Sequence, residues 1–212
     1  MIFSNKNILL CVTGGIAAYK SPEIIRLFKK DGADVKVVMT ESAKEFITPL
    51  TLQAVSGNEI HDSLLDIEAE RAMGHIELAK WADLILIAPC TAETLSKLTH
   101  GRADDLMGAL ILASNASVYI APAMNMNMWS NKGTQENFES LSSRGYSFIG
   151  PAEGEQACGD IGPGRMVEPS EIIKLISISL ENGPFNKKTI TITAGPTSCL
   201  LYTSPSPRDL GK

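Results

Sequence analysis

The stretch 7–20, NILLCVTGGIAAYK, constrains the fold of this chain more than any other. Within it, Ile8–Val12 form an unbroken apolar run, which is typical of a strand buried on both faces of a parallel sheet. The run ends at Thr13–Gly15, and a helical pattern begins at Ile16. A strand, a glycine turn and a helix in this order place the helix N-terminus at the carboxyl edge of the sheet, where its N–H groups suit a phosphate. The alternative is a tight connection that binds nothing.

The remaining chain repeats this order of strand and helix. Further strands are predicted over 35–38, 84–88, 118–121 and 146–149, and helices over 16–31, 49–56, 94–100, 104–112, 134–144 and 170–180. The alternation predicts an α/β fold, a doubly wound, Rossmann-like or flavodoxin-like parallel sheet with helices on both faces. The glycine turn is not the dinucleotide fingerprint, because it holds no G-x-G-x-x-G.

Local signals set several helix ends. Pro22 falls inside the first helical segment, so the helix either restarts there with Ser21 as its cap or carries a kink. Thr48-Pro49 predicts a cap and a first-position proline for a short helix that stops at Gly57. Ser170 is the predicted cap of the last helix. By contrast, the glycine-rich stretch 150–169 shows no period, which predicts a long loop serving as a lid or binding loop, or a disordered segment.

Composition limits the functions that remain. A net charge of -5 without a Lys/Arg cluster argues against a nucleic-acid partner, and no apolar run approaches a membrane span. The four cysteines lack C-x-x-C spacing, which favours reduced thiols in the cytoplasm. We expect one domain over 1–183, a linker and a strand over 184–197, and a disordered tail over 198–212.

Four segments that carry small or polar side chains follow predicted strands. They are 14–17, 40–42, 91–94 and 123–125. Ligands of open α/β sheets sit at the carboxyl ends of the strands, so these segments are expected to gather around one site. They offer hydroxyls and amides but no metal-ligand cluster, which favours a neutral or anionic organic ligand and predicts no metal. The alternative is that each hydroxyl or amide merely caps a helix.

Three further residues carry chemistry of their own. The imidazole of His75 could act as an acid or base, although a lone histidine is more often structural. Asn125 lies among alternating methionines before Trp129, where the alternatives are an apolar face and a wall against a planar ring. Cys158 lies in the glycine-rich stretch, from which a thiol could deliver a proton.

Taken together, these segments resemble the homo-oligomeric flavin-containing cysteine decarboxylases. The closest likeness is to the branch of phosphopantothenoylcysteine decarboxylases that forms half of a bifunctional coenzyme A biosynthesis protein. The resemblance covers about residues 6–197. Its carriers are VTGGIAAYK, His75, APCTAET, PAMNMNMW at 122–129 and ACGDIGPGRM at 157–166.

The resemblance implies a role for each matching residue. The cofactor would be FMN, contacted by Gly14, Gly15, Ile16, Thr40, Ser42, Thr91, Ala92, Glu93, Thr94 and Ala123. His75 would be the active-site base, Asn125 would hold the substrate carboxylate, and Cys158 would donate the final proton. Cys90 and Glu93 depart from the residues often found in the family, which leaves their flavin contacts open.

The implied reaction is the FMN-dependent decarboxylation of 4′-phospho-N-pantothenoylcysteine to 4′-phosphopantetheine. Oxidation of the cysteine thiol to a thioaldehyde makes the carboxylate labile, and returning the hydride leaves no net redox change. The alternatives are a related flavoprotein with another substrate, or a non-catalytic flavin-binding regulatory protein. The family further implies a homotrimer or a homododecamer of trimers. Residues 194–197 match the start of a CTP-dependent ligase domain, and the following residues do not, so ligase activity is expected to be absent.

Overall fold

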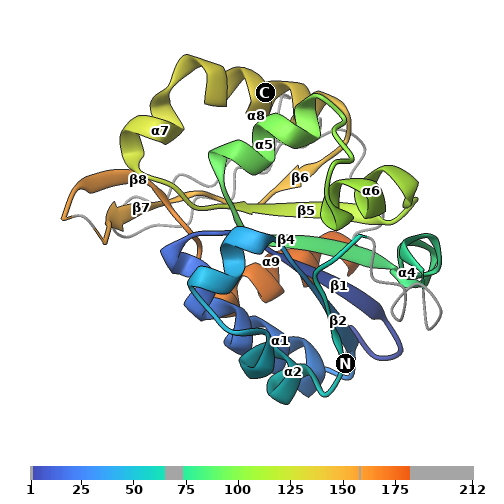
Figure 1. Cartoon of the computed structure of the whole chain (residues 1–212). Coiled ribbons are helices and arrows are strands. Elements are labelled where there is room, and N and C mark those ends of the chain that lie inside the picture. The colour runs from blue at the N-terminus through green and yellow to red at the C-terminus, as the bar shows by residue number, and fades with distance from the viewer. Residues whose placement is uncertain (1, 65–73, 158, 182–212) are drawn as a thin grey trace, which may run out of the picture.

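Six parallel strands form the central sheet of the protein (Figure 1). The structure, a computed structural model, describes residues 2–64, 74–157 and 159–181. Within these ranges the strand order is β3-β2-β1-β4-β5-β6. The strands are β1 (Asn7–Val12), β2 (Asp34–Met39), β3 (Ile60–His61), β4 (Leu84–Cys90), β5 (Ser117–Pro122) and β6 (Ser147–Phe148). The chain winds outward in both directions from β1, which confirms the predicted doubly wound, Rossmann-like fold.

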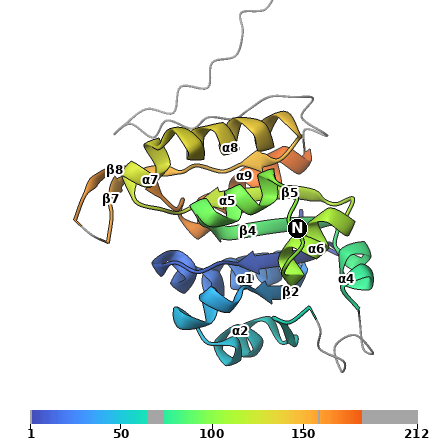
Figure 2. The same ribbon diagram turned by 45° about the horizontal axis from the view of Figure 1, so that its top comes forward.

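Helices cover both faces of this sheet (Figure 2). One layer holds α1 (Ser21–Lys30), α2 (Pro49–Ser56) and α9 (Pro169–Glu181), and the other holds α4 (His75–Trp81), α5 (Ala92–Thr99), α6 (Leu106–Ala113) and α8 (Lys132–Ser143). Two short 3-10 helices, η1 (Ile16–Lys20) and η2 (Glu41–Glu45), follow β1 and β2, and α7 (Met126–Ser130) follows β5.

Strand β1 shows why its apolar run is unbroken. Ile8, Leu10 and Val12 pack in the core beneath α1 and α9, whereas Leu9 and Cys11 pack in the opposite core. All five side chains are fully buried. Burying a large aliphatic side chain contributes about 1.5–3 kcal/mol, so the two cores fix β1 from both sides. The glycine turn that follows therefore starts from a rigid strand.

The structure decides the alternatives at the helix ends. Thr48 accepts a hydrogen bond from the N–H of Thr51, Pro49 is the first residue of α2, and Gly57 ends the helix with a φ of 74°, as predicted. The segment around Pro22 is a restart, because η1 ends at Lys20 and α1 begins at Ser21. The cap position is Lys20, so the prediction of Ser21 as the cap is wrong by one residue.

Two predictions about local structure are wrong, and two short elements were missed. The stretch 150–169 is not a structureless loop, because β7 (Ala152–Glu155) and β8 (Ile161–Arg165) pair as an antiparallel hairpin. The inward positions of β7 are alanine and glycine, which a hydrophobicity pattern does not register. Strand β3 and helix α7 were also not predicted from the sequence. Ser170 is not a cap, because α9 begins one residue earlier, at Pro169.

Several predictions fall outside the described residues. They concern Cys158, the linker and strand over 184–197, and the tail over 198–212. The domain boundaries after residue 181 therefore stay predictions. In the part of the chain that the structure describes, no helix is both long enough and apolar enough to cross a membrane.

Candidate active site

The turns after β1, β2 and β4 converge at the carboxyl edge of the sheet. We call these turns, residues 13–16, 40–42 and 91–94, the rim. A Cβ placed on Gly14 would lie 2.5 Å from the Oγ of Ser42 and 2.9 Å from the Ser42 carbonyl oxygen. A Cβ placed on Gly15 would lie 4.0 Å from the Cγ2 of Thr91. The structure therefore brings together three of the four segments that the sequence predicted to share a site.

Buried hydroxyls of the glycine turn and of the start of α1 bind the backbone of β4. The Thr13 hydroxyl donates to the carbonyl of Pro89 at 2.7 Å, and the Ser21 hydroxyl donates to the carbonyl of Ala88 at 3.3 Å. Both hydroxyl-bearing residues are buried, with at most 1% of their surface exposed. Sequence reasoning missed both contacts, because a threonine or serine beside a turn does not reveal a partner more than sixty residues away.

The hydroxyls of the rim also bond to one another. The oxygens of Thr40 and Ser42 lie 3.2 Å apart, and those of Thr91 and Thr94 lie 2.9 Å apart. Thr91 also caps α5 by accepting the N–H of Thr94 at 3.2 Å. The helix-capping alternative thus holds for Thr91, while Thr40, at the cap position before η2, makes no side-chain cap bond.

The other predicted rim contacts lie at helix starts. Ala92 and Glu93 form the first turn of α5, with Glu93 exposed. Ile16 begins η1 and is 61% exposed, which is unusual for a large aliphatic side chain beside a buried strand. The rim therefore combines neutral hydroxyls, a glycine pair and an exposed apolar side chain. This combination suits a ligand with both an anionic and a flat apolar part.

Asn125 lies beyond the end of β5, where it caps α7. Its Oδ1 accepts the N–H of Asn127 at 2.8 Å, and its Nδ2 donates to Oδ2 of Asp160 at 3.0 Å. The preceding segment is tied to β4, because the N–H of Ala123 donates to the carbonyl of Cys90 at 2.9 Å. Asn125 therefore caps a helix, as the alternative predicted, and its amide is also held in one orientation. This fourth segment joins the rim through β4.

The end of the hairpin is joined to η1 by a buried lysine. The Lys20 ammonium, 6% exposed, donates to Glu168 at 2.9 Å and to the Met166 carbonyl at 3.3 Å. Hydrogen bonding to Lys20 holds the pKa of the Glu168 carboxyl below its ordinary value. Arg165 donates to the same carboxylate at 2.7 Å. These contacts connect the hairpin to the element that directly follows the glycine turn.

His75 lies on a different part of the molecule. It is the first residue of α4, and α4 leads into the end of the sheet where β1 and β4 begin: the N–H of Asp83 donates to the Asn7 carbonyl at 2.9 Å. In Figures 1 and 2, α4 and α7 lie at opposite ends of the sheet. One copy of the described chain therefore does not bring α4 to the rim.

Cys90 and Cys11 lie in the core under the rim. Both thiols are fully buried, and burial raises the pKa of Cys11 to about 12 and raises the pKa of Cys90 still further. The open flavin contact of Cys90 would thus be made by its backbone, since its side chain has no exposed surface. Among the described residues, no group of three His, Cys, Asp or Glu side chains could hold a metal ion.

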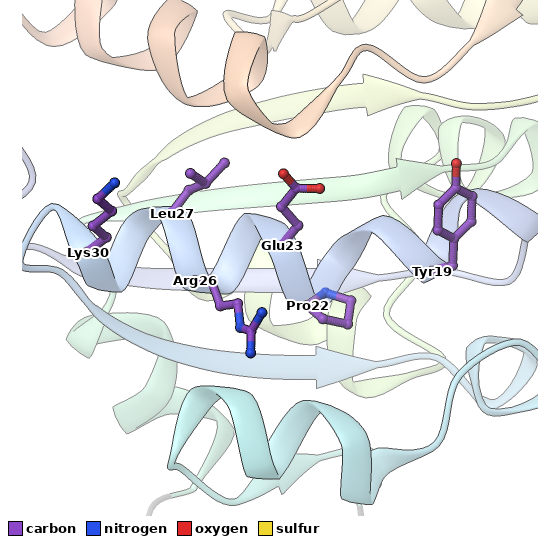
Figure 3. A pocket seen from close by; sticks show the side chains of 6 residues that line it. All are labelled: Tyr19, Pro22, Glu23, Arg26, Leu27 and Lys30. Carbon is purple, nitrogen blue, oxygen red and sulfur yellow. The ribbon is translucent and has the colours of Figure 1, made fainter.

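A separate groove runs along η1 and α1 (Figure 3). Its lining residues are Tyr19, Pro22, Glu23, Arg26, Leu27 and Lys30. None of them is a predicted site residue, and all six come from two consecutive helical elements, η1 and α1. The groove lacks the convergence of separate turns that defines the rim, so we place the candidate site at the rim.

Residues 3–181 match the model of the family described as Flavoprotein. Because the match covers more than half of the chain, the chain belongs to this flavoprotein family. Its curated relatives include the coenzyme A biosynthesis bifunctional protein CoaBC of Vibrio vulnificus (strain YJ016), 56% identical over 194 residues, which are 92% of this chain and 48% of the relative. The protein of the same name from Escherichia coli (strain K12) is 52% identical over 200 residues, 93% of this chain and 49% of the relative. The chain spans about half the length of these curated relatives.

Solved structures agree with this assignment. A PPC decarboxylase mutant complexed with pantothenoylaminoethenethiol is 32% identical, with a TM-score of 0.73, and the match covers 84% of this chain and 99% of that one. The FMN binding protein AtHal3 is 33% identical, with a TM-score of 0.72, and the match covers 84% of this chain and 98% of that one. The resemblance drawn from the sequence to a family of flavin-containing proteins is confirmed.

Proposed function

We propose that this protein binds FMN and decarboxylates 4′-phospho-N-pantothenoylcysteine to 4′-phosphopantetheine, a step of coenzyme A biosynthesis. The observation that carries the proposal is the convergence of the rim turns with the segment that presents Asn125. The 56% identity to the bifunctional coenzyme A biosynthesis protein supports the choice of substrate.

The rim fits FMN on structural grounds. Ser42 lies where a Cβ of Gly14 would be, so the absence of a side chain lets the turns after β1 and β2 pack closely together at the rim. The hydroxyls of Thr40, Ser42 and Thr91 are neutral donors suited to a phosphate. Ile16 offers an exposed apolar surface to a planar ring. When bound, FMN would supply the reversible oxidation of the substrate thiol that makes the carboxylate leave.

The protein's own residues would position the substrate and move protons. Asn125 would donate its amide N–H to the substrate carboxylate, a charge-assisted hydrogen bond that orients the bond to be broken. His75 would act as the base, and Cys158 would return the proton to the carbon that loses CO₂. These roles of Asn125, His75 and Cys158 come from the resemblance.

The position of α4 supports an assembly in which two copies share each site. Within one copy α4 lies at the opposite end of the sheet from α7, so His75 would have to come from a neighbouring subunit. A homotrimer, alone or in a dodecamer, is the assembly that the family implies. The site would then be complete only in the oligomer.

One experiment tests the activity directly. The purified protein is incubated with FMN and 4′-phospho-N-pantothenoylcysteine, and the product is identified by mass spectrometry. The proposal predicts loss of 44 Da and an unchanged flavin spectrum after turnover. Flavin uptake without this product would favour another substrate or a regulatory role, and a protein that takes up no FMN would contradict the proposal entirely.

A second experiment tests the shared site. The variants His75→Asn and Asn125→Asp are each expected to lose at least about 100-fold in turnover, the usual contribution of a positioned acid or base. Mixed oligomers, refolded or co-expressed from both variants with different tags, should recover a measurable part of the activity. Equal inactivity in the mixture would contradict a site built from two copies.

A further inference from the structure

One side chain, that of Gln156, bridges the hairpin and α7. It follows β7, its Oε1 accepts the N–H of Met126 at 3.1 Å, and its Nε2 donates to the carbonyl of Pro163 at 3.0 Å. An N–H can only donate and a carbonyl can only accept, so these two partners determine the orientation of the carboxamide. The bridge needs an acceptor and a donor at the end of one side chain.

The same turn of the hairpin holds the amide of Asn125. The backbone N–H of Gln156 donates to the carbonyl of Asp160 at 2.8 Å, which closes the turn between them. The Asp160 carboxylate accepts a hydrogen bond from Nδ2 of Asn125, and the backbone N–H of Asn127 donates to Oδ1 of Asn125. Partners at both ends thus fix which side of the Asn125 amide carries the hydrogens. A shift of Gln156 would also shift Asp160.

The backbone of β8 completes the docking. The N–H of Met124 donates to the carbonyl of Gly164 at 2.9 Å. A Cβ on Gly164 would lie 2.3 Å from the Met124 carbonyl oxygen, and its φ of 128° is one that side chains rarely allow. The N–H groups of Met124 and Met126 therefore report directly on whether the hairpin sits on α7.

We propose that Gln156 is a positioning residue, which docks the hairpin on α7 and, through Asp160, holds the Asn125 amide with its N–H side toward the carboxylate of the substrate. The inference rests on the proposed function for the identity of that carboxylate. The docking itself does not depend on the substrate. A glutamine is required because methionine of similar length offers neither bond, and glutamate offers only the acceptor.

Amide hydrogen exchange on the FMN-loaded protein tests the docking without any turnover. In Gln156→Met, the amides of Met124 and Met126 should both exchange about tenfold faster, the effect of losing a hydrogen bond of ordinary strength. In Gln156→Glu, the Met126 amide should stay protected, since the carboxylate still accepts, while the Met124 amide exchanges faster. Gln53→Glu, an exposed site on α2 with the same change of charge, should leave both amides unchanged. Unchanged protection in Gln156→Met would overturn the proposal.

A double-mutant cycle tests whether Gln156 acts through Asn125. In the otherwise native protein, Gln156→Met should raise the KM for 4′-phospho-N-pantothenoylcysteine about tenfold with a smaller change in kcat, because ground-state binding of the carboxylate weakens. In the Asn125→Ala background, the same change should alter kcat/KM less than about twofold. Full additivity would overturn the positioning role.

The two failures are distinguishable. If the protein does not decarboxylate this substrate at all, the exchange pattern of the Gln156 variants still decides the docking. If it does so but Gln156→Met leaves KM unchanged, the proposed function stands and the positioning role is wrong.

Discussion

The rim and the β7–β8 hairpin contribute to one candidate site, but different forces hold them. The rim continues directly from β1, β2 and β4, whose apolar side chains fill both cores. The hairpin lies outside the six-stranded sheet and exposes even Ile161, at 78%. Its contacts with the remainder of the site include the hydrogen bonds of Gln156 and Asp160 and the backbone hydrogen bond from Met124 to Gly164. Just beyond its end, Glu168 forms an ion pair with Lys20.

This difference separates what is fixed from what can be adjusted. Distorting the rim would disturb buried strands, whereas releasing the hairpin would cost a few hydrogen bonds, each with a net value of about 0.5–1.5 kcal/mol. Regions with few buried apolar contacts open more readily than the core. We therefore expect substitutions that disturb the packing of the rim to change stability, and substitutions around the hairpin to change activity at nearly constant stability.

The largest expected effect separates the two roles of Asn125. Asn125→Ala loses both the cap of α7 and the amide, so we expect kcat/KM to fall about 100-fold and stability to fall by about 1 kcal/mol. Asn125→Asp keeps the cap but places a second carboxylate beside Asp160, so its melting temperature should exceed that of the alanine variant while its activity is no higher. Steady-state kinetics and thermal melts measure both. An aspartate variant with native activity would contradict this prediction, because the Asn125 amide would then not be needed for activity.

The next effect belongs to the rim. In Gly14→Ala the new methyl group collides with Ser42, so we expect a loss of about 1–3 kcal/mol in the free energy of unfolding, measured by urea denaturation. Gly15→Ala is the matched control: its φ of 179° is open to any residue, and its nearest neighbour lies 4.0 Å away. It should unfold like the native protein but bind FMN more weakly. Equal stability of the two variants would show that the rim is more pliable than the packing indicates.

A smaller effect comes from the junction of the two regions. Because Lys20 holds the folded-state pKa of Glu168 below the ordinary value of 4.5, the ion pair stabilises the protein above that pH and ceases to do so as the pH falls through the folded-state pKa. Glu168→Gln should therefore lower stability at pH 7, by less than about 1 kcal/mol because the carboxylate is half exposed. Urea midpoints from pH 7 to pH 3.5 should converge for the two proteins. A constant difference across this range would exclude the charge as its cause.

The smallest expected effect is that the two cysteines beneath the rim, Cys11 and Cys90, are not alkylated in the native protein. Burial raises the pKa of Cys11 to about 12 and raises that of Cys90, so almost no thiolate exists at pH 8. Iodoacetamide should modify neither cysteine in the native protein and both after denaturation, as peptide mass mapping would show. Modification of Cys90 in the native state would mean that the rim opens as readily as the hairpin.

The same contrast explains which features could be predicted from the sequence. The fold class and the rim turns follow from apolar runs that end in glycine or hydroxyl residues, as at Ile8–Val12 and Gly14. Such signals are local, because a strand buried on both faces needs consecutive apolar residues. The ends of α2 were likewise predictable from single residues, because Thr48 can cap a helix, Pro49 suits its first position and Gly57 allows a positive φ.

The hairpin could not be predicted in this way. Its inward residues, such as Gly154, are too small to produce a hydrophobic period, and its docking depends on Gln156 meeting Met126, thirty positions away. Short elements such as β3, with two residues, exist only because a neighbouring strand offers them hydrogen bonds. The assignment of His75 came from family resemblance, and no local pattern indicates that α4 lies at the opposite end of the sheet from α7.

The crowding around Gly14 also limits which substitutions this position tolerates. Replacing Ser42 by glycine would remove the colliding Oγ and Cβ, yet the Ser42 carbonyl oxygen would still lie 2.9 Å from any new methyl group. A glycine at position 42 would therefore relieve only part of the crowding that a side chain at position 14 meets. Gly15 meets no such steric barrier, so packing excludes a side chain at position 14, whereas at position 15 the expected cost is weaker FMN binding.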